Sequence, residues 1–162
     1  MLEAYTKIVE RAKSQKKTHK KFLEHLKRLK PADLDQVTNR LHDEAFSHID
    51  CTLCANCCKT TGPLLLEKDI SELSRELQMK PAAFQQQYLQ IDEDGDHIFK
   101  SMPCPFIGSD NLCSVYDARP KACREYPHTQ QRNIYQKLEI THKNAMICPA
   151  VAEVVEMLKE IY

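Results

Sequence analysis

The sequence is poor in residues that many binding folds require. Its 162 residues include no tryptophan and only three glycines, at positions 62, 95 and 108. Neither a G-x-G-x-x-G fingerprint nor a P-loop occurs, so no glycine-rich segment could surround the phosphates of a nucleotide. These absences argue against a self-contained nucleotide-dependent enzyme, and whether the chain catalyses any reaction stays open.

Long apolar segments are also missing. No run of about 18 apolar residues exists, so we expect no membrane-spanning helix. The first residues, MLEAYTKIVERAKSQKK, contain neither the apolar stretch nor the small-residue cleavage site of a secretory signal. We therefore expect a cytoplasmic protein, in a compartment that keeps cysteines reduced.

Charge is unevenly distributed, although the formal net charge is zero. Residues 1–30 hold ten Lys or Arg and three Asp or Glu, and residues 31–162 hold 13 and 20. The basic segment predicts a solvated helix face, which we favour, or a surface that binds nucleic acid, an acidic membrane or a protein partner. Aromatic residues do not alternate with the lysines as a stacking platform for bases requires, so a protein partner is favoured over nucleic acid.

Hydrophobic spacing predicts a mainly α fold with one small β-hairpin. Helical periodicity is found at about 2–29, 32–49, 67–79, 82–89 and 145–161. The first two stretches are expected to pair as an N-terminal antiparallel helical hairpin around Pro31. Two short β-type runs flank Asp94-Gly95, a strong turn signal. We thus expect an N-terminal helical arm, 1–50, and a single cysteine-cluster domain, 51–162.

Eight cysteines are the most informative feature of the sequence. Residues 51–58 read CTLCANCC, and four further cysteines follow at positions 104, 113, 123 and 148. Two residues between cysteines let the backbone turn so that both sulfurs reach one metal, with N–H groups free to bond the thiolates. A reducing compartment disfavours structural disulfides. The repeated C-x2-C spacing therefore predicts a thiolate metal site.

The adjacent pair Cys57-Cys58 raises the question of how many metals bind. On a strand the two side chains face opposite sides, and on a helix they diverge by about 100°. If residues 51–58 are helical, Cys51, Cys54 and Cys58 share one face and Cys57 points elsewhere. The pair thus indicates either two metals or one metal with an additional nearby thiol.

Three segments together resemble a known family. They are CTLCANCC at 51–58, PCPFIGSDNLCSVYDARPKACREYP at 103–127, and the late Cys148-Pro149. This pattern is similar to the YkgJ-type cysteine-cluster family, which is named for zinc or iron chelation. The resemblance covers about 51–150 and leaves 1–50 uncovered. It implies metal binding without a settled reaction, and it implies as ligands Cys51, Cys54, Cys57, Cys58, Cys104, Cys113, Cys123 and Cys148.

The sequence leaves the metal open between zinc and a [4Fe–4S] cluster. Both take four cysteines, and soft thiolates suit either. C-x2-C-x2-C followed by a remote Cys-Pro is ferredoxin-like, which favours the cluster slightly. Arg119 and Arg124 flank Cys123 and are expected to balance the negative charge of thiolates. His48 and His128 are further possible donors.

The cysteine pattern allows three functions. The first is a metal-binding protein used for electron transfer or metal handling. The second is a cluster-dependent enzyme component, because a related cysteine cluster occurs in flagellin lysine methylases. The third is a thiol redox sensor with Cys57-Cys58 as its reactive pair. We favour the first because it accounts for every cysteine.

Overall fold

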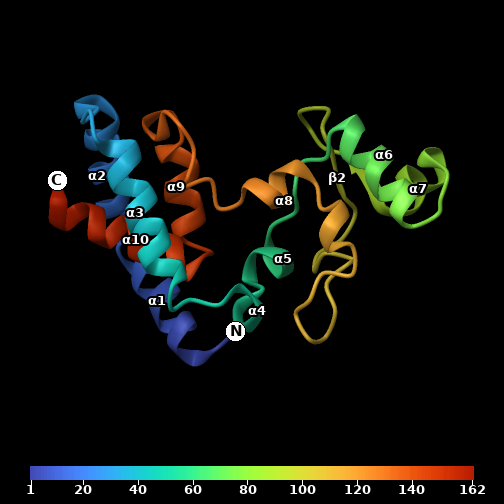
Figure 1. Cartoon of the computed structure of the whole chain (residues 1–162), viewed down its shortest axis with the longest axis horizontal. Helices are drawn as coiled ribbons and strands as arrows, with labels where there is room; N and C mark the ends of the chain where they lie inside the picture. The colour runs from blue at the N-terminus through green and yellow to red at the C-terminus, as the bar shows by residue number, and fades with distance from the viewer. The chain divides into compact units, whose positions relative to one another are not determined.

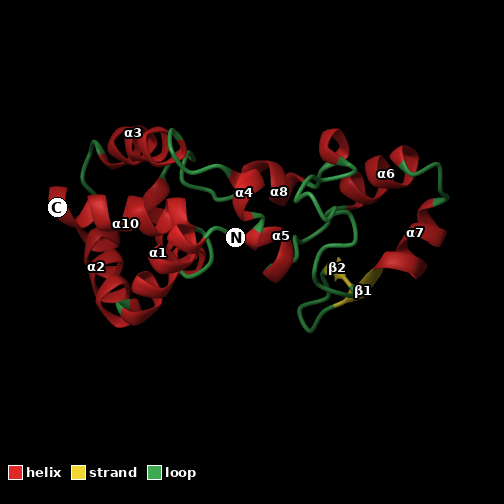
Figure 2. Ribbon diagram, turned by 90° about the horizontal axis from the view of Figure 1, so that it is seen from below, coloured by secondary structure: helices red, strands yellow, loops and turns green.

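The structure is a computed structural model that describes all 162 residues, and it divides into two compact units. Unit 1 consists of residues 1–54 and 127–162, and unit 2 of residues 55–126. Helices dominate both units, and the only sheet is one two-stranded hairpin (Figures 1 and 2). The predicted fold class, mainly α with a small β-hairpin, is confirmed. No helix combines the length and apolar character that crossing a membrane requires.

Unit 1 is a helical bundle built around its last helix. Its elements are α1 (Glu3–Ser14), α2 (Lys16–Leu29), α3 (Leu34–Phe46), α4 (Cys51–Cys54), η2 (Ile134–Gln136), α9 (Leu138–Ala145) and α10 (Pro149–Ile161). Helix α10 packs against α1, α3 and α9, and α2 packs against α9 (Figure 1). Apolar residues of α10 are buried along its length, from Ala150 to Leu158. The last helix is therefore the centre of the core.

The C-terminal helical segment differs from its prediction. A helix was expected over 145–161, but α9 ends at Ala145 and α10 begins at Pro149, with Cys148 as its N-cap residue. Proline suits the first position of a helix because its missing N–H would have no intrahelical partner there. The break places Cys148 at a helix start, which the periodicity of the apolar residues alone did not show.

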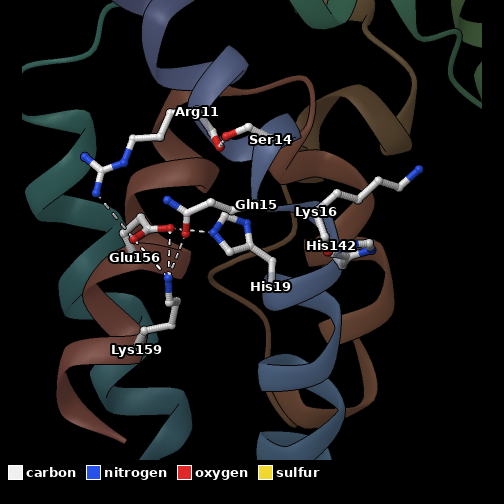
Figure 3. Close-up of polar contacts among 8 residues, drawn as sticks. All are labelled: Arg11, Ser14, Gln15, Lys16, His19, His142, Glu156 and Lys159. Carbon is white, nitrogen blue, oxygen red and sulfur yellow. Dashed lines mark hydrogen bonds and ion pairs between the residues drawn. The ribbon is translucent and has the colours of Figure 1, made fainter.

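The N-terminal helices also pack differently from the prediction. The stretch expected as one helix is divided at Gln15, and α3 packs mainly against α10 instead of pairing with α1 and α2. Fully buried His19 on α2 contacts Glu156 on α10, and Lys159 on α10 donates to Gln15 Oε1 at 3.1 Å (Figure 3). These contacts tie the basic segment into unit 1. The predicted domain boundary at residue 50 stays a prediction.

Unit 2 consists of short elements joined by irregular chain. They are α5 (Asn56–Thr60), α6 (Glu67–Glu76), α7 (Pro81–Tyr88), β1 (Leu89–Ile91), β2 (His97–Phe99), η1 (Tyr116–Ala118) and α8 (Lys121–Glu125). The strands pair antiparallel with Leu89 opposite Phe99, as the predicted hairpin requires. Gly95 has a φ of 86°, a left-handed conformation that glycine adopts without steric cost, so it suits the turn.

The core of unit 2 extends to two of the cysteines. Its buried members are Leu65, Ile70, Leu73, Phe84, Leu89, Phe99, Phe106 and Val115. Phe106 lies centrally, with ring centroids 5.6 Å from Phe99 and 6.4 Å from Phe84. Cys104 and Cys113 pack against this cluster. Aromatic packing therefore positions the chain that carries these two thiols.

Candidate metal centre

The cysteine run at 51–58 is two short helices rather than one. Ala55, between α4 and α5, has a left-handed conformation with a φ of 49°. A non-glycine residue in this region ends a helix, because continued left-handed turns cost about 1–2 kcal/mol per residue. The prediction that Cys51, Cys54 and Cys58 share one helix face is therefore wrong. The division between the compact units falls at the same place, between Cys54 and Ala55.

In unit 1, hydrogen bonds around Asp50 fix the start of the run. The Asp50 carboxylate accepts from the backbone N–H of Thr52 at 2.8 Å and from its hydroxyl at 2.7 Å. The Asp50 backbone N–H donates to the Tyr5 hydroxyl at 2.9 Å. Tyr5 belongs to α1 and is buried, so the core of unit 1 holds the first turn of α4 and the two cysteines that it carries.

Cys148 supplies a third thiol in unit 1. Its backbone N–H donates to the Asn144 carbonyl at 2.8 Å, and its side chain is buried. Burial raises the pKa of the Cys148 thiol to about 12, and the negative charges of Cys51 and Cys54 act in the same direction. The three thiols therefore lie close enough for their charges to interact. A bound cation would favour the thiolates that burial disfavours.

In unit 2, helix α5 is joined to the segments that carry Cys104 and Cys113. The Cys104 backbone N–H donates to the Cys58 carbonyl at 2.8 Å. Lys59, the next residue, donates to the side-chain oxygen of Asn111 at 2.5 Å. Two polar contacts from neighbouring residues thus hold α5 beside the 104–113 loop.

The loop between Cys104 and Cys113 is tightly turned. An isolated antiparallel bridge joins Ile107 to Cys113, and the Gly108 N–H donates to the Leu112 carbonyl at 2.8 Å. A Cβ atom on Gly108 would lie 2.5 Å from a carboxylate oxygen of Asp110. A side chain at position 108 would displace the Asp110 carboxylate, which accepts from the Leu112 N–H at 3.0 Å. The bridge and the Gly108 hydrogen bond bring the two cysteine-bearing ends of the loop together.

Cys123 lies on α8, which a buried carboxylate connects to α6. Asp69, 2% exposed, accepts from the Lys121 N–H at 2.8 Å and from the Leu66 N–H at 2.9 Å. One side chain thereby satisfies backbone donors at the starts of both helices. Asp69 was not among the predicted site residues. Its place in the first turn of α6 is a detectable capping signal, but its contact with α8 is tertiary and leaves no pattern in the sequence.

Four thiols of unit 2 influence one another electrostatically. Burial raises the pKa of Cys123 to about 12, and the charges of Cys58, Cys104 and Cys113 add to this effect. Burial also raises the pKa of Cys104, with contributions from Cys58 and Cys113. These mutual effects show that segments far apart in the sequence bring their sulfurs into one neighbourhood.

The adjacent cysteines are closer than predicted. The sulfurs of Cys57 and Cys58 lie 3.9 Å apart, so the expectation that they point away from each other is wrong. A hydrogen bond from Cys57 lowers the pKa of Cys58 to about 7 against the opposing effect of burial, and the positive charge of Arg119 assists. The S–S edge of a tetrahedral zinc site with bonds of about 2.3 Å is ~3.8 Å long, which this spacing matches.

The two arginines have different surroundings. Arg119 lies over the Tyr116 ring, 3.3 Å from its centroid, and its charge acts on the thiols of Cys58 and Cys123. Arg124 instead lies 3.7 Å from a carboxylate oxygen of Glu72 and 3.9 Å from one of Asp69. Arg119 is thus placed to balance thiolate charge, whereas Arg124 belongs to the polar contacts between α6 and α8.

The histidines considered as donors have protein partners. His48 Nε2 lies 2.7 Å from a carboxylate oxygen of Glu153 on α10. His128 Nδ1 lies 3.2 Å from the side-chain nitrogen of Gln131. Both belong to unit 1, and these contacts give each imidazole a structural role in that unit.

The donors fit a soft metal by chemistry. No disulfide joins any of the eight cysteines. No group of three or more His, Cys, Asp or Glu side chains has an arrangement that could hold a metal ion as it stands. Side-chain rotation would therefore have to bring the sulfurs of each neighbourhood to bonding distance. Thiolates are the preferred ligands of zinc and iron–sulfur clusters, so the residues fit either group.

Closely spaced cysteine pairs with no disulfide among them are typical of metal sites with thiolate ligands. Residues 50–149 match the family described as "CxxCxxCC: Putative zinc- or iron-chelating domain". The match spans more than half of the chain, which therefore belongs to this family, as the sequence resemblance predicted. No curated protein and no solved structure matches the chain.

Proposed function

We propose that this protein binds zinc or an iron–sulfur cluster through its cysteines and serves in metal handling or electron transfer. One observation carries the proposal: backbone contacts bring the segments of Cys58, Cys104 and Cys113 together, and these three thiols are close enough to raise the pKa of Cys123. Four half-buried thiols would not be gathered for packing alone, because each thiolate charge opposes the next. A bound cation would outweigh the repulsion between the thiolates.

The spacing of Cys57 and Cys58 is compatible with two thiolates on one ion but does not require it. Their S–S distance of 3.9 Å is close to the edge of a tetrahedral site. Zinc satisfies this condition, and so does iron that carries two cysteine ligands. A [4Fe–4S] cluster has one cysteine on each iron, so only one sulfur of this pair would be a ligand. A site completed by Cys104, Cys113 and Cys123 needs only one sulfur of this pair, so both zinc and the cluster remain compatible with it.

The experiment is metal analysis of anaerobically purified protein. Zinc, iron and sulfide are measured on one sample together with the visible absorption spectrum. We expect either a colourless zinc protein or a broad band near ~400 nm with matching iron and sulfide. A protein without metal that binds none on reconstitution contradicts the proposal. If its free-thiol count then falls on mild oxidation, the thiol redox alternative takes its place.

We further propose that the basic segment 1–30 is the docking surface for an acidic protein. All ten of its lysines and arginines are exposed. Deleting the segment is a poor test, because Val9, Leu23 and Leu26 lie in the core of unit 1. Reversing the charge of exposed Lys17, Lys20 and Lys27 is the better variant. Binding of a poly-glutamate peptide should weaken with salt and be lost in this variant, while metal content stays unchanged.

A further inference from the structure

The eight cysteines divide between the two units. Residues 51, 54 and 148 belong to unit 1, and residues 57, 58, 104, 113 and 123 belong to unit 2. The division passes through the cysteine run itself, at the left-handed residue Ala55. A run that reads as one motif in the sequence is therefore shared by two separately packed parts.

We propose that the chain binds metal at two independent sites. The first site has Cys51, Cys54 and Cys148 as ligands, and the second has Cys58, Cys104, Cys113 and Cys123. This inference rests on the proposed metal binding and adds the number of sites and the ligands of each. Neither the family description nor the C-x2-C spacing assigns the cysteines in this way.

Ligand number supports two sites. A tetrahedral zinc ion accepts four thiolates, so eight cysteines exceed the capacity of one ion. Within unit 2 the Cys104 N–H donates to the Cys58 carbonyl at 2.8 Å, and a bridge from Ile107 to Cys113 closes the loop that follows. Cys123 is close enough for its pKa to respond to these three thiols, and Cys57 is an additional thiol 3.9 Å from Cys58. Within unit 1 the start of the cysteine run lies beside the first turns of α10, because His48, three residues before Cys51, contacts a carboxylate oxygen of Glu153 on α10 at 2.7 Å. Cys148 is the N-cap residue of that helix.

The two sites differ in how many coordination positions of the metal the protein fills. Four protein thiolates close a tetrahedral site, and closed sites are structural. Three protein ligands leave a position for water, substrate or a thiol from another molecule, and such sites are the reactive ones. The second site would therefore stabilise unit 2, whereas the first would hold exchangeable metal. Metal handling is therefore assigned to the site in unit 1.

The test compares two matched single variants of the full chain, Cys148→Ser and Cys123→Ser. Each removes one buried or half-buried thiol beside a helix start while keeping nearly the same volume. Metal-free reduced protein is titrated with Zn²⁺ and then challenged with a chromogenic chelator. Wild type should bind two zinc ions and release them in two phases. Cys148→Ser should lose the fast phase, Cys123→Ser the slow phase, and each should retain one ion.

Several outcomes overturn the two-site assignment. They are a wild type that binds a single ion, a variant that loses both ions, and two variants that lose the same phase. Cys54→Ser and Cys104→Ser repeat the comparison if a first variant does not fold, as judged by circular dichroism. A wild type that binds no zinc and assembles no cluster contradicts metal binding itself. That result differs from binding one ion, so the two failures can be distinguished.

Discussion

Unit 1 and unit 2 carry thiols on different kinds of support. In unit 1 the cysteines lie at the ends of helices whose core, centred on α10, is apolar and continuous. In unit 2 they lie on a five-residue helix, a tight loop and another five-residue helix. A helix end is positioned by its bundle with or without metal. A loop that carries several thiols is not positioned by a helical core, so bound metal should contribute more to the stability of unit 2 than to that of unit 1.

Each unit also contains a buried polar link, and the two links differ in strength. In unit 2 the Asp69 carboxylate is 2% exposed and accepts two backbone hydrogen bonds. In unit 1 the buried His19 ring contacts Glu156, which is 28% exposed and also bonded to Lys159 (Figure 3). A carboxylate in contact with water loses less when a partner is removed. We expect the link in unit 2 to contribute more stability.

Metal removal should produce the largest difference in stability between the two units. Structural zinc supplies about 10–16 kcal/mol of apparent folding free energy in zinc-finger peptides, which is as large as the whole stability of an ordinary domain. Stripping the reduced full chain with a strong chelator should therefore unfold unit 2 and leave unit 1 folded. Hydrogen exchange would show this as fast exchange in α6 and α7, with protection kept in α10. Equal loss of protection in both units would contradict the comparison.

The second effect is smaller and concerns Asp69. Asp69→Asn replaces one accepting oxygen with an N–H2 group that must face a backbone donor. Removing one partner from a buried, hydrogen-bonded charge costs about 3 kcal/mol. We expect that loss in unit 2, measured by urea unfolding of the metal-loaded protein. Glu76→Gln, an exposed change on the same helix, is the control and should stay within ~0.5 kcal/mol of wild type. Equal unfolding midpoints for the two variants would show that Asp69 is not a structural link.

The comparison also shows which features the sequence could reveal. Periodicity predicted the helices with buried apolar stripes, and Asp94-Gly95 predicted the hairpin, because both signals are local. The break at Ala55 was not predictable, since alanine favours helices and only tertiary packing places it at positive φ. The packing of α3 against α10 was missed for a related reason. An apolar stripe shows that a helix is buried on one face, but not which other helix covers that face.

The sequence predicted which residues make up the site, but not how they are arranged in space. The residue type and spacing of the cysteines indicated metal chelation, and the family match confirms that class. Their division between two packed units depends on where the chain returns to unit 1, at residues 127–162, far from the run in the sequence. Asp69 and the stacking of Arg119 on Tyr116 depend on the same long-range packing.

A third prediction separates the two arginines of unit 2 by what each contacts. Arg119→Gln removes the positive charge beside Cys58 and Cys123 and should weaken zinc binding in unit 2 by about tenfold, the lower end for residues around metal ligands. Arg124→Gln should leave zinc affinity unchanged and lower only the unfolding midpoint, since its charge faces Asp69 and Glu72. Competition with a chelator of known affinity measures both. The reverse pattern would place the charge balance at Arg124.

The smallest effect should be the pH dependence of the link in unit 1. Although partial burial would raise the pKa of the Glu156 carboxyl, hydrogen bonds from His19 and Lys159 hold it below its usual value of 4.5. A carboxyl with a depressed folded pKa stabilises the protein above its unfolded pKa, and that stability is lost as pH falls through the folded pKa. Wild type should therefore lose protection in α10 between about pH 5 and pH 3 more steeply than Glu156→Gln, measured by hydrogen exchange on metal-free reduced protein. Glu160→Gln, an exposed change on the same helix, should follow wild type. Parallel curves for all three proteins would mean that the His19–Glu156 contact adds no charge-dependent stability, and that unit 1 relies on its apolar core alone.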